Sequence, residues 1–505
     1  MPTMRMRFAA APLVAALAFV GVGCGGSSSS SKQSAAGGPS GAEVIPAGAP
    51  AYVAVNTDLG SAQWKQVDAL SKTFPGRAKV IAQIQQQLMK SGVDFKTDVK
   101  PALGPEIDFA WLDFADNGAN VVAVTQPKDE AKFAALVDKS NKSDPKNTLY
   151  TEKVGDWTAL SDSQAKLDRL KSAQNGAKLS DDQRFKDATA DLPGDALVKA
   201  YANGQAIRQA ISGSLPSSVG ANGLVLSGSG LEQFDWISAA GTAESNGIQI
   251  TAGAKGGPGG TTYTSELVNA LPAGAWADVS FNNLEAGIRK ILTTLDSTPG
   301  FSAKRAQLEQ ALGFSVENDL LPLFAGEGAL AVYPGAAGSR IPAIDFVLKV
   351  NDEAKAQRVL QRIGALARLG KIGTVRTVTV GGVTATELRP ASANVSIYFA
   401  LSKGMIIVTN SQSALGAIGG GGTKLADDPL FKEARAGAKA PDKTSGFVYV
   451  NLHASLSTLL NLVARSAPSS SIAEIQANTA PLQSFFLYST KDGDVRRAGG
   501  FLEIK

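Results

Sequence analysis

The chain has 505 residues, of which 44% are hydrophobic and 19% are charged, as in ordinary folded proteins. Its formal charge of +4 is scattered along the sequence rather than gathered in basic stripes, which argues against nucleic acid as a partner. One cysteine and one histidine exclude an intramolecular disulfide and a zinc site made of cysteine and histidine ligands.

The first 23 residues have the three parts of a secretory signal. Arg5 and Arg7 precede an apolar stretch, residues 8–20, and small residues lead from Gly21 to Cys24. In a bacterial lipoprotein signal the cysteine at this place is acylated, so we expect lipid attachment at Cys24, although Gly21 stands where that signal usually has a larger apolar residue. The alternative is an ordinary secretory signal in which Cys24 has no role.

Residues 24–42 form a tether rich in glycine and serine, with five consecutive serines at 27–31. Such a segment cannot bury apolar surface, so we expect it to be disordered. No later stretch reaches about 18 uncharged apolar residues, the length that a membrane-spanning helix needs. The sequence thus predicts a secreted body anchored by lipid to the outer face of the cytoplasmic membrane.

The folded part is predicted to be one unit written twice. Residues 45–56, IPAGAPAYVAVN, and residues 271–282, LPAGAWADVSFN, share seven of twelve positions at an offset of 226. Each pairs a proline–glycine turn with a strand that ends at an asparagine. Further paired landmarks follow in the same order. We therefore expect a first repeat over residues 43–256, a linker over 257–270 and a second repeat over 271–505.

In the first repeat, apolar spacing predicts the following elements in chain order. They are a strand at 51–56, helices at 64–74 and 80–88, a hairpin of strands 107–114 and 120–126, a helix at 129–141, a hairpin of strands 148–154 and 157–160, helices at 163–173 and 181–189, a strand at 197–203, a helix ending near 212, and a hairpin of strands 233–245 and 248–254. Antiparallel hairpins dominate, so the predicted class is α+β, with β-α-β-β modules as the smaller unit.

Four asparagines, each at the end of a strand that enters a helix, could converge on a polar ligand. They are Asn56, Asn203, Asn282 and Asn451. The local interpretation is that each caps the helix after it by accepting a hydrogen bond from a free backbone N–H. We favour the caps because they require only local geometry.

Acidic residues recur at matching places in both repeats. Glu106 and Glu327 could form a pair for acid–base chemistry or for a hard cation, but they also fit the turn before a strand. The motif DEAK at 129–132 and 352–355, and the acid pairs at 181–182 and 427–428, lack the pattern of a calcium loop and suit the first turns of helices.

Two further motifs are explained by ordinary structural roles. Residues 419–424, GGGGTK, lack the glycine before the lysine and the hydroxyl residue after it that a phosphate loop needs, so a turn ending a helix is favoured. His453 could serve as the base of a serine hydrolase, but no G-x-S-x-G motif occurs, and residues 228–230, GSG, have the wrong spacing. We expect a solvated or capping histidine.

The opening strand PAGAPAYVAVNTD, the DEAK helix start, the signal ending at Cys24 and the tether together resemble the bacterial family called domain of unknown function 3352. The resemblance covers residues 43–505 and implies an envelope protein of about this size. It implies no activity and no catalytic residue.

The sequence leads us to expect a membrane-anchored extracytoplasmic lipoprotein with a non-enzymatic binding or scaffold role. The expected partners are the membrane, through the N-terminal lipid, and an unknown envelope protein or apolar ligand. No catalytic, cofactor-binding or metal-binding residue is predicted. The alternative is a carrier of a lipid or other apolar ligand, and a hydrolase is less favoured. A cleft between the repeats would favour binding, whereas a continuous sheet through both would favour a scaffold.

Overall fold

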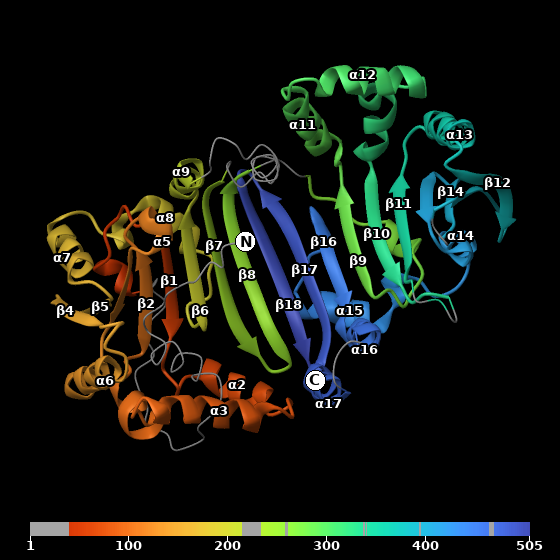
Figure 1. Ribbon diagram of the computed structural model, residues 1–505. Helices are drawn as coiled ribbons and strands as arrows, with labels where there is room; N and C mark the ends of the chain where they lie inside the picture. The colour runs from red at the N-terminus through yellow and green to blue at the C-terminus, as the bar shows by residue number, and fades with distance from the viewer. Residues whose placement is uncertain are drawn as a thin grey trace.

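A computed structural model of the chain describes residues 40–214, 234–257, 261–336, 339, 341–392, 395–463 and 469–505. These residues form one sheet of 18 strands, all joined to their neighbours in antiparallel pairs (Figure 1). Helices lie against both faces and beyond the strand ends. The α+β class expected from the sequence is therefore confirmed, and the two repeats share one sheet.

The strands of the first repeat are β1 (Ala51–Asn56), β2 (Glu106–Trp111), β3 (Val121–Thr125), β4 (Tyr150–Val154), β5 (Trp157–Ser161), β6 (Val198–Asn203), β7 (Phe234–Glu244) and β8 (Gly247–Gly256). Those of the second are β9 (Ala277–Asn282), β10 (Glu327–Tyr333), β11 (Ala343–Lys349), β12 (Gly373–Val380), β13 (Val383–Pro390), β14 (Ile397–Ser402), β15 (Met405–Thr409), β16 (Gly446–Asn451), β17 (Leu482–Asp492) and β18 (Val495–Ile504).

The strand pairs give the order across the sheet as β4, β5, β3, β2, β1, β6, β7, β8, β18, β17, β16, β9, β10, β11, β15, β14, β13, β12. Each repeat thus contains two strand–helix–strand–strand modules, β1–β2–β3 and β6–β7–β8 in the first, as the β-α-β-β pattern predicted. The first repeat has no described hairpin that corresponds to β12 and β13 of the second.

The α-helices of the first repeat are α2 (Ala62–Ser71), α3 (Arg77–Lys90), α4 (Lys100–Ala102), α5 (Ala115–Gly118), α6 (Glu130–Ser143), α7 (Gln164–Ser172), α8 (Gln183–Thr189) and α9 (Gly204–Ser214). Those of the second are α11 (Glu285–Asp296), α12 (Phe301–Leu312), α13 (Glu353–Leu369), α14 (Gln412–Ala417), α15 (Pro429–Gly437), α16 (Leu452–Val463) and α17 (Ser469–Thr479).

The two repeats meet along β8 and β18, the innermost strand of each. Equivalent residues in this part of the two repeats are 248 positions apart in the sequence, as Tyr201 and Tyr449 are. In the β8–β18 pair Thr251 lies opposite Gly499. Gly499 is also the residue of the second repeat that is equivalent to Thr251. An approximate two-fold axis therefore passes through the sheet at this pair, and it exchanges the two repeats.

The proline–glycine turns hold each repeat's opening strand to a later motif. Pro46 bridges to Lys178, and Pro272 bridges to Lys424. Next to these turns Ile45 and Leu271 are fully buried, each in the main core of its own repeat. The twin sequences at 45–56 and 271–282 therefore specify where the chain closes on itself.

The segment predicted as a linker, residues 257–270, is in part structural. Tyr263 forms a bridge with Thr444, and the turn at Leu267–Asn269 buries Leu267 in the core of the second repeat. The sequence suggested a linker because of the glycines at 256–260, but the apolar residues after them belong to the second repeat.

Candidate functional site

Burial alternates along the central strands, so that one face of the sheet is closed and the other is open. On β1, β6, β9 and β16 the fully covered side chains include Tyr52, Tyr201, Asp278 and Tyr449, which share the closed face. The residues between them are partly or largely exposed. Since neighbouring side chains on a strand point to opposite faces, the exposed set lies on one surface, here called the open face.

The open face is apolar across both repeats. One register row joins Ala200, Ala239, Ala252 and Ala498 on β6, β7, β8 and β18. The adjacent row includes Val448, Val279 and Leu330 on β16, β9 and β10. Val198, Val279 and Leu330 keep 39%, 37% and 38% of their surface exposed. A contiguous apolar surface of this extent is typical of an interaction site.

Helices leave the middle of the open face uncovered within the described part of the chain. In Figure 1 the broad centres of β7, β8, β18 and β17 are unobstructed, and helices lie toward the ends of the strands. On the closed face α7 and α8 bury Leu167 and Phe185 in the first repeat, and α15 buries Phe431 in the second. On the open face α6 and α13 cover the outer strands, where they bury Leu136 and Val359, so the difference in helix cover is confined to the central strands.

One end of the open face is covered by α2. Val67 and Leu70 on this helix, with Phe74 just after it, form one apolar cluster with Ala243, Ile248 and Leu502 on β7, β8 and β18. The backbone N–H of Ala243 also donates to Oε1 of Gln63 at 2.7 Å. An amphipathic helix is thus one occupant that this surface accepts.

The closed face buries three aspartates. Asp108 and Asp278 are fully buried, and their carboxylate oxygens make no hydrogen bond that meets ordinary geometry. Burial raises the pKa of Asp108 well above its usual value, and the charge of Glu106 raises it further. Burial and Glu327 raise the pKa of Asp278 to about 8. These groups lie within packed cores, where they reach no substrate, so they carry no catalytic assignment.

Asp345 has a partner. Burial raises its pKa to about 6, opposed by a hydrogen bond of 2.6 Å that the Thr409 hydroxyl donates to it. Asp278 and Asp345 both lie opposite Ala331, on β9 and β11. In the described chain, no three histidine, cysteine or acidic side chains gather as a metal site would require.

The four asparagines do not converge. Asn56 and Asn203 lie at opposite ends of the paired strands β1 and β6, and Asn282 and Asn451 do the same on β9 and β16. The cap prediction is confirmed for Asn203, which accepts from Ala206 at 3.2 Å, and for Asn451, which accepts from Ala454 at 2.9 Å.

The cap prediction is wrong for Asn56. Asn56 accepts from the N–H of Asp58 in a local turn, and Ser61 caps α2 instead. The chain inserts a turn between strand and helix, so the cap moves downstream. At the other site Leu284, not Asn282, is the residue before α11, and it provides no side-chain cap.

The paired glutamates are far apart. Glu106 begins β2 and Glu327 begins β10, and eight strands lie between them in the sheet. At about 4.8 Å per strand the separation is roughly 43 Å, which excludes a shared acid–base site. Glu327 accepts from the N–H groups of Glu266 and Leu267, so its role is structural.

The remaining acidic motifs cap helices, in agreement with the prediction that they lie at helix starts. Asp129 caps α6 and Asp352 caps α13, through the N–H of Lys132 and Lys355. Asp182 and Asp428 cap α8 and α15 in the same way.

The residues considered for phosphate binding and hydrolysis have local roles or none. Nζ of Lys424 donates to the carbonyl of Ala417 at 3.1 Å, and Lys178 donates likewise to Gln174, so both lysines close their own turns. His453 is exposed on the first turn of α16 and makes no hydrogen bond to a described serine or aspartate. Cys24 and residues 228–230 lie outside the described residues.

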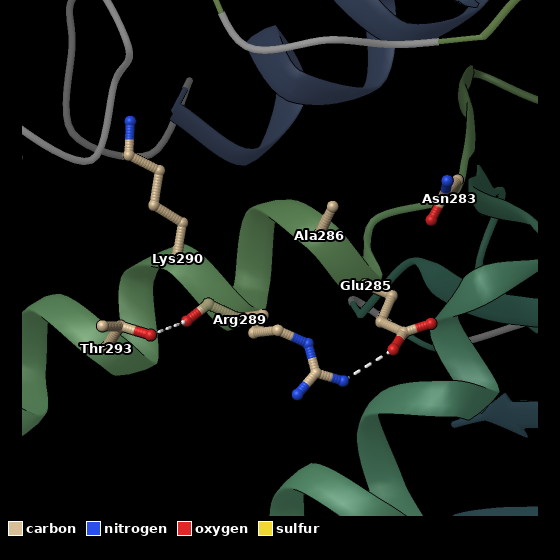
Figure 2. A pocket seen from close by; sticks show the side chains of 6 residues that line it. All are labelled: Asn283, Glu285, Ala286, Arg289, Lys290 and Thr293. Carbon is tan, nitrogen blue, oxygen red and sulfur yellow. Dashed lines mark hydrogen bonds and ion pairs between the residues drawn. The ribbon is translucent and has the colours of Figure 1, made fainter.

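A surface hollow of about 510 Å³ lies along α11 (Figure 2). Its polar lining is already paired in part: Arg289 donates to Glu285 at 2.7 Å, and Thr293 donates to the Arg289 carbonyl. Lys290 extends away from that ion pair. Among the described residues this lining includes no nucleophile paired with a base, so it supports no enzymatic assignment.

The open face was missed by the sequence argument, although a signal was present. A sheet with one solvated face shows apolar and polar residues in alternation. The strands AYVAVN at 51–56 and GFVYVN at 446–451 are instead apolar at both parities. That pattern indicates apolar surface on both faces, and only the fold shows which face lacks a cover.

Comparison with solved structures found distant likenesses. The chain is similar to TP0453 in crystal forms I, IV and III, with 14%, 13% and 11% sequence identity and TM-scores of 0.24, 0.24 and 0.22. These matches cover 48%, 46% and 43% of this chain and 79%, 76% and 80% of TP0453. At such TM-scores the likeness carries no argument about this chain.

No curated protein matches the chain. Residues 8–491 match the family described as "Protein of unknown function (DUF3352)". The match spans the opening strands of both repeats, the helix-capping motifs and most of the sheet, and it agrees with the resemblance seen in the sequence. The chain belongs to the DUF3352 family of proteins of unknown function.

Proposed function

We propose that this protein is a non-enzymatic lipoprotein, anchored by Cys24 outside the cytoplasmic membrane, which holds a partner protein on its open face. The observation that carries the proposal is the apolar surface that continues across both repeats, with Val279 and Leu330 more than a third exposed in its second half. Burying such side chains against a partner gains about 25 cal/mol per Å² of apolar surface.

The continuous sheet supports a scaffold rather than a receptor with a cleft. The nine residue pairs between β8 and β18 join the repeats through backbone hydrogen bonds, so their relative placement is fixed. A rigid surface loses little conformational entropy when a partner binds. In the described chain no helix is both long and apolar enough to cross a membrane.

The alternative, a carrier of an enclosed apolar ligand, has less support. A second hollow, beside Trp236 and Ser238, has a volume of about 30 Å³. This is about the share of one water molecule and far below the size of ordinary ligand pockets. The open face is a surface, which suits a macromolecule better than a small ligand that needs enclosure.

The test places a photo-crosslinking amino acid at Leu330 of the full chain in its own host. The control carries it at Leu369, which is 80% exposed at the end of α13, a helix over the outer strands of the second repeat and not over the central ones. We expect one defined protein adduct at position 330 and none at 369, and we expect Val279→Asp to abolish it. Equal labelling at both positions, or an adduct that Val279→Asp leaves unchanged, would refute the proposal.

A further inference from the structure

The two ends of the open face are related by the approximate two-fold axis, yet they differ in chemistry. At one end the docking surface of α2 consists of Ala243, Ile248 and Leu502, with Leu482 beside them. The offset of 248 relates β7 to β17 and β8 to β18, since both hairpins pair in the same register: Ala243 lies opposite Ile248, and Lys491 lies opposite Arg496.

At the other end the counterparts of these residues form what is here called the twin dock. Ala243 is replaced by Lys491, Ile248 by Arg496, Leu502 by Ala254 and Leu482 by Phe234. Arg496 and Ala254 lie opposite each other in the β8–β18 pair, so they adjoin on the sheet. The apolar dock of the first end is thus a mixed one here, with two cations beside an aromatic ring.

Within the described chain, the guanidinium of Arg496 has no carboxylate partner. Its guanidinium carbon lies 5.9 Å from the centre of the Phe234 ring, a cation–π contact. Nε and Nη2 are buried and donate no hydrogen bond to any residue that the structure describes. A guanidinium presents its N–H groups in a fork that matches a carboxylate, and leaving them buried without an acceptor is costly.

The helix that corresponds to α2 does not supply an acceptor. α11 buries no residue, and Leu284 just before it and Ile291 on it remain 38% and 44% exposed. Its carboxylates pair elsewhere: Glu285 pairs with Arg289 on the same helix, and Asp296 pairs with Arg305 on α12. By contrast, α2 buries Leu70 and joins the apolar cluster at its own dock.

We infer that the twin dock binds an amphipathic helix of the partner protein, with a carboxylate on the helix paired to Arg496. The inference rests on the proposed function and specifies the partner's chemistry. The occupant is a helix because α2 shows how this sheet geometry receives one, through a stripe spaced by three and four residues. It is acidic because Lys491 and Arg496 replace Ala243 and Ile248.

The probe is a stapled, fluorescent helix with the sequence of residues 61–74 and Leu70 replaced by glutamate, which puts a carboxylate in the stripe. Binding to the full chain is measured by anisotropy, with the unmodified helix as control. We expect the acidic helix to bind at least tenfold more tightly than the unmodified one. Arg496→Leu should abolish that preference.

The matched control is Arg497→Leu. Arg497 is the next residue on the same strand, but it points to the closed face, where it pairs with Asp191 at 2.8 Å. The Arg497→Leu variant should therefore keep the preference for the acidic helix. A charge exchange guards against loss of folding: Arg496→Glu should prefer a helix with lysine at the same place.

Three results would overturn the inference. Equal binding of the two helices would remove the role of charge, and a failed charge exchange would remove the pairing. Binding of the full chain to anionic vesicles through Arg496, without binding to the helix, would assign the dock to a lipid surface. If the helix fails but the crosslink at Leu330 persists, the twin dock fails and the proposed function stands.

Discussion

The cores of the two repeats place different residues on the same framework. Where the first repeat has Tyr52, the second has the buried Asp278, and where the first has the buried Asp108, the second has Ala329. Ser238 of the first repeat corresponds to Phe486, which packs between Phe431 and Phe447 in the second. Turns, aspartate caps and strand register are kept while core chemistry changes, so the framework depends on local geometry more than on particular core residues.

The largest expected effect is a difference in stability between variants at Phe486, in the aromatic core of the second repeat, and at Ser238, the equivalent residue of the first. Phe486→Ala should lower the free energy of unfolding by about 3–5 kcal/mol, because Phe486 is 1% exposed and its removal leaves a cavity. Ser238→Ala should change it by less than about 1 kcal/mol, because the Ser238 hydroxyl is buried without a hydrogen bond. Urea unfolding of both variants measures the difference. Similar losses would show that the two cores contribute alike.

The next effect concerns Asp278 and pH. Its pKa in the folded state is about 8, above the usual value near 3.9 for an unfolded chain. Well below pH 4 both states are protonated, so the residue adds no pH dependence to the stability. Between pH 4 and 8 the unfolded state releases its proton first, so stability falls as pH rises.

Asp278→Asn should remove that dependence and raise the free energy of unfolding at pH 8 by an amount of the order of 2 kcal/mol. The control is Asp129→Asn, an exposed helix cap whose variant should keep the wild-type profile. Unfolding curves at pH 4, 6 and 8 give the comparison. A wild-type profile that Asp278→Asn leaves unchanged would mean that Asp278 is ionised in the folded protein.

The smallest effect compares two equivalent caps. Asp182 caps α8 through Arg184 and Phe185, and Asp428 caps α15 through Leu430 and Phe431. Asp428 also accepts from the N–H of Gly274 at 2.9 Å, which ties the cap to the turn that opens the second repeat. Asp182→Ala should cost about 1 kcal/mol and Asp428→Ala about 2 kcal/mol, both read from thermal unfolding. Equal costs would mean that the bond to Gly274 contributes nothing.

The sequence predicted the elements and the duplication well because both depend on local signals. The caps at Asp129, Asp352, Asp182 and Asp428 follow from residue type and position alone. The single sheet was not predictable, because the pairing of β8 with β18 joins residues about 250 positions apart, and nothing local specifies it.

The candidate site was beyond reach for a related reason. The open face is defined by Val279 and Leu330, which no described helix buries. A sequence pattern reports what a strand can bury, not what packs on it. The pair of Glu106 and Glu327, which the sequence offered as a possible site, occupies equivalent positions in the two repeats. Equivalent positions lie on opposite sides of the two-fold axis, so they come together only near Thr251 and Gly499.

The seam between β8 and β18 suggests how such a chain arose. Each strand is the free edge of its own repeat, ten residues long, and an unpaired edge of that length invites pairing with another chain. Two identical ancestors could pair in this way only through a two-fold axis, as in a homodimer, and fusion of their genes would make the pairing permanent. Residues 40–257 expressed alone should therefore sediment as a dimer, and a stable monomer would contradict this origin.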